Sequence, residues 1–303
     1  MDTEQRPYVS VIDPIGPAVT RVKEILFKPF DLTKWFVIGF CAWLAGLGER
    51  GGGFNFNFNF PRHGESHHIK EIVIENLCWA IPVAAIGFVL MLAIGVVICW
   101  LSSRGKFMFL HCVAQNKAEV KIPWRKFRQQ GNSLFVFRLV AVIIAAVCIA
   151  VLAGAMIFLI ILISGNKGGV IAPAVVGLVS VISLLIAVSI FMALLMKFTK
   201  DFVVPIMFLG TIRCMDGWRQ FLKILSVNKA RFALYILFQI VIGMAIGGII
   251  LAAAVCTCCC ACCFMAIPYI GTVVLLPLLI FSRAYSVFYL SQYGAELDVF
   301  QGL

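Results

Sequence analysis

Residues 81–101 read IPVAAIGFVLMLAIGVVICWL, an apolar run without a charged side chain. A helix needs about 20 such residues to cross the hydrocarbon core of a bilayer, so this run has the character of a transmembrane helix. The whole chain of 303 residues follows the same pattern, with 62% hydrophobic and 13% charged residues. Soluble domains contain about 45–50% apolar and about 25% charged residues. The composition therefore excludes an ordinary soluble protein.

Six apolar segments are candidates for crossing the membrane. They cover residues 33–47, 73–101, 134–164, 170–197, 232–262 and 267–291. The glycine-rich sequence GNKGG at 165–169 is a tight turn, so the third and fourth segments should form a helical hairpin. The sequence therefore predicts an all-α polytopic protein, a single membrane domain over residues 1–303 with six transmembrane helices.

The basic residues are distributed unevenly between the two sides of this topology. One side carries 21 of the 25 Lys and Arg residues and the other carries 4. Cytoplasmic segments are enriched in Lys and Arg, so both termini and the two long basic loops are expected in the cytoplasm. In a membrane protein a formal net charge of +11 is explained by this orientation before any binding partner is considered. We therefore expect no nucleic-acid partner.

An internal repeat is visible around two tryptophans. Trp-Arg-Lys-Phe at 124–127 precedes the third segment, and Trp-Arg-Gln-Phe at 218–221 precedes the fifth. An aromatic-rich sequence follows each motif by about ten residues. The chain therefore divides into three approximate units, each a basic amphipathic helix followed by two spans. These units cover residues 15–101, 107–197 and 206–291.

The basic amphipathic segments are the leading candidate binding surface. Their aromatic rings suit the level of the lipid headgroups and their charges suit phosphate. The simpler alternative is that they are topological anchors that link the hairpins. The candidates for binding anionic lipid headgroups or an acidic partner protein are Trp124, Arg125, Lys126, Arg128, Trp218, Arg219 and Lys223.

An exoplasmic loop of low complexity, residues 48–70, contains alternating Phe and Asn. In an extended segment the period of two places its rings on one face. Such a strand could join copies of the chain into a homo-oligomer, or it could form an interfacial loop. The candidate rings are Phe54, Phe56, Phe58 and Phe60.

A cysteine-rich run closes the fifth segment. Its CxxC spacings would suggest zinc or redox chemistry in a soluble chain. Here close helix packing through small residues is the favoured explanation, so we expect no cofactor and no metal. The weak metal candidates share one helical face at Cys256, Cys259, Cys260 and Cys263.

The start of the sixth segment contains Pro268, Gly271 and Pro277, which can break a helix. A broken helix at membrane depth must line protein or water, so these residues are the pore or ligand candidates for a passive channel or permease. Residues 139–164, 170–196 and 232–282 contain no ionisable side chain apart from the cysteines and tyrosines. This pattern argues against a proton-driven transporter.

Enzyme signatures such as HExxH, GxSxG or a Walker loop do not occur. Glu71 and Glu75, or the cysteines, would have to act in a lipid-modifying enzyme, which is the third alternative. The leading expectation is therefore a non-enzymatic membrane protein that binds lipid or a partner as a scaffold or accessory subunit.

The sequence also resembles a known group. SSRGKFMFLHCVAQNKAEVKIPWRKFRQQGNSLFVFRL at 102–139, IPYIGTVVLLPLLIFSRAYSVFYLSQYG at 267–294 and ELDVF at 296–300 carry the likeness. They are similar to an uncharacterised bacterial multi-pass membrane family, known as a domain of unknown function. That family is distantly similar to the membrane domain of glycerophosphodiester phosphodiesterases. The resemblance implies a bacterial inner membrane and brings no catalytic residue with it.

Overall fold

The computed structural model describes residues 9–48, 77–165, 171–256 and 267–300. Within these ranges the chain is helical and contains no strand, which confirms the predicted all-α class. The predicted exoplasmic loop lies outside the described ranges except for its first residue.

Four helices in the described part are long and apolar enough to cross a membrane. They are α4 (Leu77–Gln115), α6 (Arg128–Gly165), α7 (Ile171–Phe198) and α10 (Lys229–Cys256). A π-helix, η1 (Thr199–Val203), continues α7 into α8 (Val204–Gly210). With 39 residues, α4 is about 58 Å long, roughly twice the thickness of the hydrocarbon core. Part of such a helix must therefore lie outside the membrane.

The long helices change from exposed to buried along their length. On α7, the Phe191 side chain is 63% exposed, whereas Phe202 on the η1 continuation is fully buried. On α4, most large apolar side chains between Val83 and Val97 are exposed, and the residues from Ser102 to Ala114 are buried. Extended apolar surfaces of this kind match lipid. The protein is accordingly embedded in a membrane, and its buried core lies at one end of the long helices.

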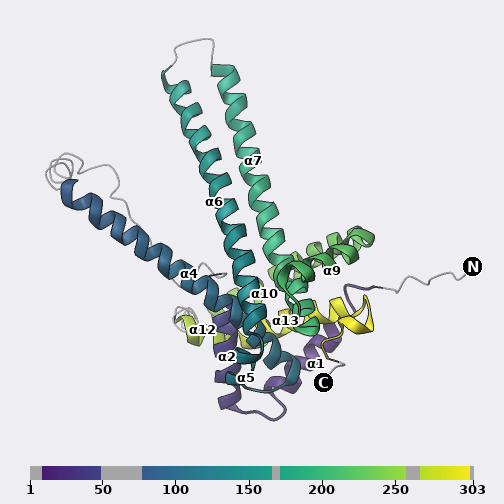
Figure 1. The fold of residues 1–303 in the computed structure, drawn as a ribbon. Helices are drawn as coiled ribbons and strands as arrows, with labels where there is room; N and C mark the ends of the chain where they lie inside the picture. The colour runs from purple at the N-terminus through teal and green to yellow at the C-terminus, as the bar shows by residue number, and fades with distance from the viewer. Residues whose placement is uncertain (1–8, 49–76, 166–170, 257–266, 301–303) are drawn as a thin grey trace, which may run out of the picture.

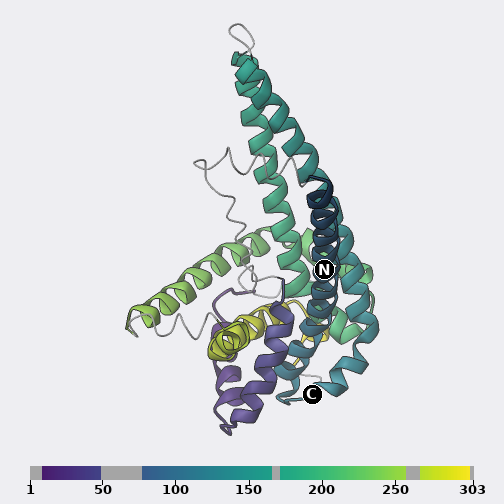
Figure 2. The same ribbon diagram turned by 90° about the vertical axis from the view of Figure 1, so that its left-hand side faces the viewer.

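The long helices leave this core in different directions. Figure 1 and Figure 2 show α6 and α7 running side by side as a hairpin, as the sequence predicts. α4 crosses the lower end of α6 and then diverges from it. α10 departs in another direction and is seen along its length in Figure 2. Away from the core, the apolar sides of α4 and α10 therefore face outward.

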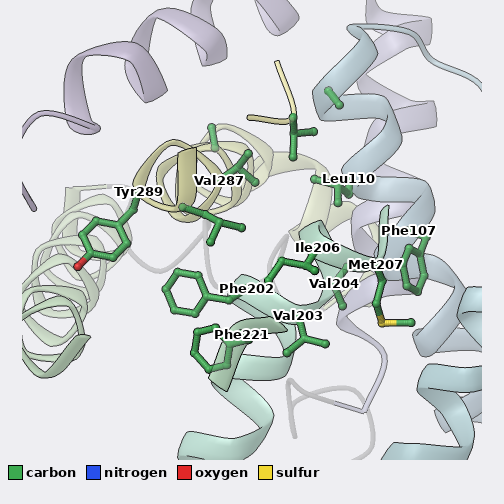
Figure 3. Packing of buried hydrophobic residues seen from close by; sticks show 14 of the residues in the cluster. Phe107, Leu110, Phe202, Val203, Val204, Ile206, Met207, Phe221, Val287 and Tyr289 are labelled. Atoms are coloured by element: carbon green, nitrogen blue, oxygen red, sulfur yellow. The ribbon is translucent and has the colours of Figure 1, made fainter. Parts of the chain in front are cut away.

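The core itself is a helical base built from short helices and the ends of the long ones. It contains α1 (Ile15–Leu26), α5 (Lys121–Lys126) and α9 (Cys214–Val227). Its larger apolar cluster is rich in aromatic rings. Figure 3 shows Phe202, Phe221 and Tyr289 close together, and the rings of Phe202 and Phe221 stack at 5.2 Å. The base is thus a packed protein interior in its own right.

The predicted first and sixth spans correspond to shorter apolar helices. The first is α2 (Leu32–Gly46), with 15 residues. The sixth is divided at Leu275 into α12 (Pro268–Val274) and α13 (Leu276–Ser291), of which α13 has 16 residues. About 20 residues are needed to cross the hydrocarbon core. The structure therefore supports four long candidate spans and leaves six spans as a prediction.

The two ends of the described chain meet on the base. Ser10 donates its backbone N–H to Gln292 Oε1 at 2.7 Å, and Gln292 Nε2 donates to the Ser10 carbonyl at 3.0 Å. The Tyr285 hydroxyl on α13 donates to the carbonyl of Val11 at 2.8 Å. A short 3₁₀-helix, η2 (Ala295–Leu297), follows. These contacts hold α1 against α13.

Candidate functional site

α9 carries the clearest candidate binding surface. Figure 1 shows α9 lying crosswise at the lower end of the α6–α7 hairpin. Its inner face holds Cys214, Gly217 and Phe221, which are buried. A Cβ at Gly217 would lie 3.0 Å from Met207 Cγ and 3.1 Å from Val203 Cγ1, so this glycine allows α9 to approach α8 and η1 closely.

The outer face of α9 combines charge with exposed apolar groups. Arg219 and Lys223 are both exposed, as the helical spacing predicts. Met215 and Leu222 share this face and are 61% and 50% exposed. Asp216 lies beside Arg219, with Oδ1 and Nη1 3.5 Å apart. Basic residues interleaved with exposed apolar ones are typical of a helix that lies in a membrane interface.

The ring of Trp218 lies between the two faces of α9. It is partly buried, with ring centroids 5.9 Å from Phe137 on α6 and 5.6 Å from Phe221. The predicted headgroup-level ring is therefore partly engaged by protein. Its role here is to anchor α9 to α6, while Arg219 and Lys223 face outward.

The second predicted basic segment contains α5. Arg125, Lys126 and Arg128 are exposed, and Trp124 is partly buried. Between α5 and α6, Phe127 is buried and stacks on Phe208 at 4.7 Å. The charged side chains of this segment therefore remain available to solvent or phosphate.

Trp124 belongs to a cluster with α4 that sequence reasoning missed. Its ring meets Trp100 edge-on at 5.9 Å. The guanidinium of Arg104 lies 4.4 Å from the Trp100 ring and 4.9 Å from the Trp124 ring. Arg104 also donates from Nη2 to Asn132 Oδ1 at 3.0 Å. A buried cation thus lies among aromatic rings and an amide at the α4–α6 crossing.

A buried polar network at the π-helix was also missed. Asp201 Oδ2 forms an ion pair with Lys197 Nζ at 3.0 Å and accepts a hydrogen bond from the Tyr235 hydroxyl at 3.1 Å. The same hydroxyl accepts from Gln239 Nε2 at 3.1 Å. Arg283 Nη1 donates to the carbonyl of Lys200 at 2.5 Å. The i, i+4 spacing of Lys197 and Asp201 was the one local signal of this network.

The three pore candidates lie at the divided sixth segment. Pro268 begins α12, Gly271 is buried within it, and Pro277 lies in the first turn of α13. α12 packs against α2, where the Tyr269 hydroxyl donates to the carbonyl of Phe36 at 2.9 Å. The break therefore contacts protein along α2, and a role for it in a pore stays a prediction.

Two further sets of candidates fall largely outside the described part of the chain. These are the four phenylalanines of the predicted exoplasmic loop and Cys259, Cys260 and Cys263. Cys256 is exposed at the end of α10. Among the residues described, no group of three or more His, Cys, Asp or Glu side chains is placed to hold a metal ion.

The fold defines an all-helical, membrane-embedded protein with a packed base at one end of its long helices. Residues 9–276 match a family described as "Family of unknown function (DUF7544)", and the chain belongs to this family. This confirms the expected membership of a family without an assigned function. No curated protein and no solved structure matches the chain. The bacterial origin and the likeness to glycerophosphodiester phosphodiesterases stay predictions.

Proposed function

We propose that this protein is a non-enzymatic scaffold or accessory subunit of a bacterial inner membrane that binds anionic lipid headgroups through the basic face of α9. The observation that carries this proposal is the outer face of α9, where Arg219 and Lys223 alternate with exposed Met215 and Leu222. This helix lies crosswise where the apolar helices end. This position supports a location of its basic side chains beside the headgroup layer.

Binding of α9 to the membrane would combine several small electrostatic attractions with the burial of apolar side chains. Each Lys or Arg near an anionic leaflet contributes about 1 kcal/mol of attraction. The exposed apolar side chains on the same face gain by entering the acyl boundary. Arg125 and Lys126 of α5, with Arg128 at the start of α6, add a second basic surface on the base.

The proposal includes the predicted topology. The side that carries 21 of the 25 Lys and Arg residues faces the cytoplasm, together with both termini. α2 and the α12–α13 pair are then the first and last of six spans. They are short because they begin or end within the base, where protein replaces lipid.

The proposal also includes the threefold repeat. Phe127 follows Trp124 by three residues and stacks on Phe107 of the preceding long helix at 5.9 Å. Phe221 follows Trp218 by three residues and stacks on Phe202 of the preceding long helix at 5.2 Å. Two basic segments thus use the same type of contact to join the base, which supports a common repeating unit.

Lipid retention tests this function. The full chain is purified in mild detergent from its own membranes, and bound phospholipids are counted by native mass spectrometry. We expect the double variant Arg219→Gln, Lys223→Gln to retain fewer anionic lipids than the wild type. High salt should reduce the difference because exposed charges are screened.

The matched control removes two charges elsewhere. Lys23 on α1 and Lys28 just after it are exposed. Figure 1 shows α1 on the side of the base away from the α6–α7 hairpin. The variant Lys23→Gln, Lys28→Gln should keep the wild-type lipid content. Equal anionic lipid content in all three proteins would refute the proposed function.

A further inference from the structure

We propose that a cleft between α6 and the α8–α9 connection binds the phosphate group of a phosphate ester that also carries a hydroxyl or ammonium donor. The cleft has a volume of about 310 Å³, within the range of small-molecule sites. Its polar lining comes from Gln129, Gln130, Asn132, Ser133, Thr211 and Arg213. This inference deepens the proposed function and rests on it, because it assigns one defined headgroup site to the same basic side.

The charge and chemistry of the lining favour an anion. Arg213 supplies a full positive charge, and the other polar lining groups are amides and hydroxyls. None of the lining residues that the structure describes is acidic. The nearest carboxylate along α9, Asp216, lies beside Arg219. The beginning of α9 adds a partial positive charge from its aligned peptide dipoles.

Two lining side chains already use their oxygen atoms as acceptors in other hydrogen bonds, which leaves their donor groups for a ligand. Asn132 Oδ1 accepts from Arg104 Nη2 at 3.0 Å and from Trp100 Nε1 at 3.3 Å, so the side-chain nitrogen of Asn132 remains to donate. Ser133 Oγ accepts the backbone N–H of Cys214 at 3.0 Å, which leaves the hydroxyl proton for another acceptor. Phosphate oxygens are acceptors for such groups.

One lining residue, in contrast, has an acceptor atom that lacks a hydrogen-bond donor. Gln130 is 7% exposed and donates from Nε2 to the carbonyl of Thr211 at 3.1 Å. Its Oε1 is buried and has no hydrogen-bond partner in the described part of the chain. A buried acceptor without a partner is costly, and a small shift of the Gln130 side chain toward the cleft would let a ligand hydroxyl or ammonium group satisfy it. A glycerol phosphate group offers both the anion and the hydroxyl.

The depth of the cleft agrees with a headgroup. The charge-free part of α6 begins after Arg138, and Ser133 lies six residues before Leu139. At 1.5 Å per residue this places Ser133 about 9 Å below the apolar part. The headgroup layer is about 5–8 Å thick on each side of the core. Ser133 therefore lies just outside this layer, adjacent to the level of the phosphates of lipids beside α6.

The test compares Arg213, which lines the cleft, with Lys23 on α1, which does not. Both side chains are exposed, so Arg213→Gln and Lys23→Gln remove equal charge with little risk to folding. The full-length chain in detergent is titrated with phosphatidylglycerol, phosphatidylcholine and free glycerol 3-phosphate, and bound ligand is measured by native mass spectrometry. We expect saturable binding of one phosphatidylglycerol, weakened at least tenfold by Arg213→Gln and less than twofold by Lys23→Gln. Phosphatidylcholine, whose headgroup has no donor, should bind at least tenfold more weakly.

Binding of free glycerol 3-phosphate with the same dependence on Arg213 supports the site and identifies a soluble ester as its ligand. Binding of the lipid alone supports the site and identifies a headgroup. Equal affinity of Arg213→Gln and wild type overturns the inference. If the double variant at Arg219 and Lys223 then still loses lipid, the proposed function survives without the cleft. If only Arg213→Gln loses lipid, the cleft survives and the α9 surface does not.

Discussion

Gly105 of α4 lies directly against the backbone of Leu44 in α2. A Cβ at Gly105 would come within 2.6 Å of the Leu44 carbonyl carbon and within 2.6 Å of the Ala45 nitrogen. Backbone atoms cannot move aside as the end of a flexible side chain can. The absent side chain at Gly105 therefore sets how closely α2 crosses α4, as small residues do at other membrane helix crossings.

The first prediction follows from this crossing. Gly105→Ala should destabilise the protein by about 1–3 kcal/mol, because it forces α2 and α4 apart. Gly95→Ala on the same helix meets no neighbouring atom within 4 Å. It should be neutral or stabilising by up to about 1 kcal/mol, since alanine favours helix. Thermal unfolding in detergent compares the two, and equal melting temperatures would show that α2 does not cross at Gly105.

A second prediction concerns the buried network at the π-helix. Tyr235→Phe removes the hydroxyl that donates to Asp201 and should cost about 1.5–3 kcal/mol, as for a hydrogen bond to a charged group. In an Asp201→Asn background the same change should cost less, because the two residues interact directly. A double-mutant cycle from thermal or denaturant unfolding measures this coupling. Additive effects would mean that the hydrogen bond contributes nothing to stability.

The third prediction concerns the thiol of Cys214. Burial against the base raises the pKa of this thiol to about 12. Ordinary thiols have a pKa of about 8.5. The thiolate is the reactive form, so alkylation of Cys214 in the folded protein should be slow at pH 8 and should still rise with pH through pH 10. Because the raised pKa favours the protonated folded state, its contribution to stability is complete below about pH 8.5 and is lost as the pH rises toward 12.

Peptide-resolved mass spectrometry after timed alkylation measures this rate at Cys214. The control is the same peptide in protein unfolded with detergent and heat, where the rate should level off above about pH 9. Matching pH profiles for folded and unfolded protein would contradict the burial of Cys214.

The fourth prediction addresses the orientation of the chain. Arg219→Cys and Lys223→Cys place thiols on the exposed outer face of α9. A membrane-impermeant maleimide should label them in inside-out vesicles and not in right-side-out vesicles, because the basic side faces the cytoplasm. The unsubstituted chain provides the background from its native cysteines. Labelling only in right-side-out vesicles would show that the chain has the opposite orientation.

Hydropathy alone could predict the apolar parts of the long helices but not where those helices end. The fourth segment was expected to end at 197, where charges begin. The structure continues the helix through η1 to Gly210, because Asp201 pairs with Lys197 and Arg283 binds the carbonyl of Lys200. Each of these charges is tolerated through a partner, and the Arg283 contact joins residues 83 positions apart.

The candidate site was predictable only where its residues follow one helix. The helical spacing of Arg219 and Lys223 placed both on the outer face of α9. Sequence reasoning did not find Arg104 or the cleft, because the contact of Gln130 with Thr211 spans 81 positions. No local pattern marks a site that two separate segments form only after folding.

The pairing of Ser10 with Gln292 has a consequence for biogenesis. These residues are separated by 282 positions, so at about 5–20 residues per second the ribosome needs roughly 14–56 s to supply the second partner after the first. During that interval α13 is absent, and the surface of α1 that packs against it is uncovered. Synthesis that stops before α13 would leave this surface open to chaperones and proteases. The arrival of α13 therefore completes the contacts that cover α1.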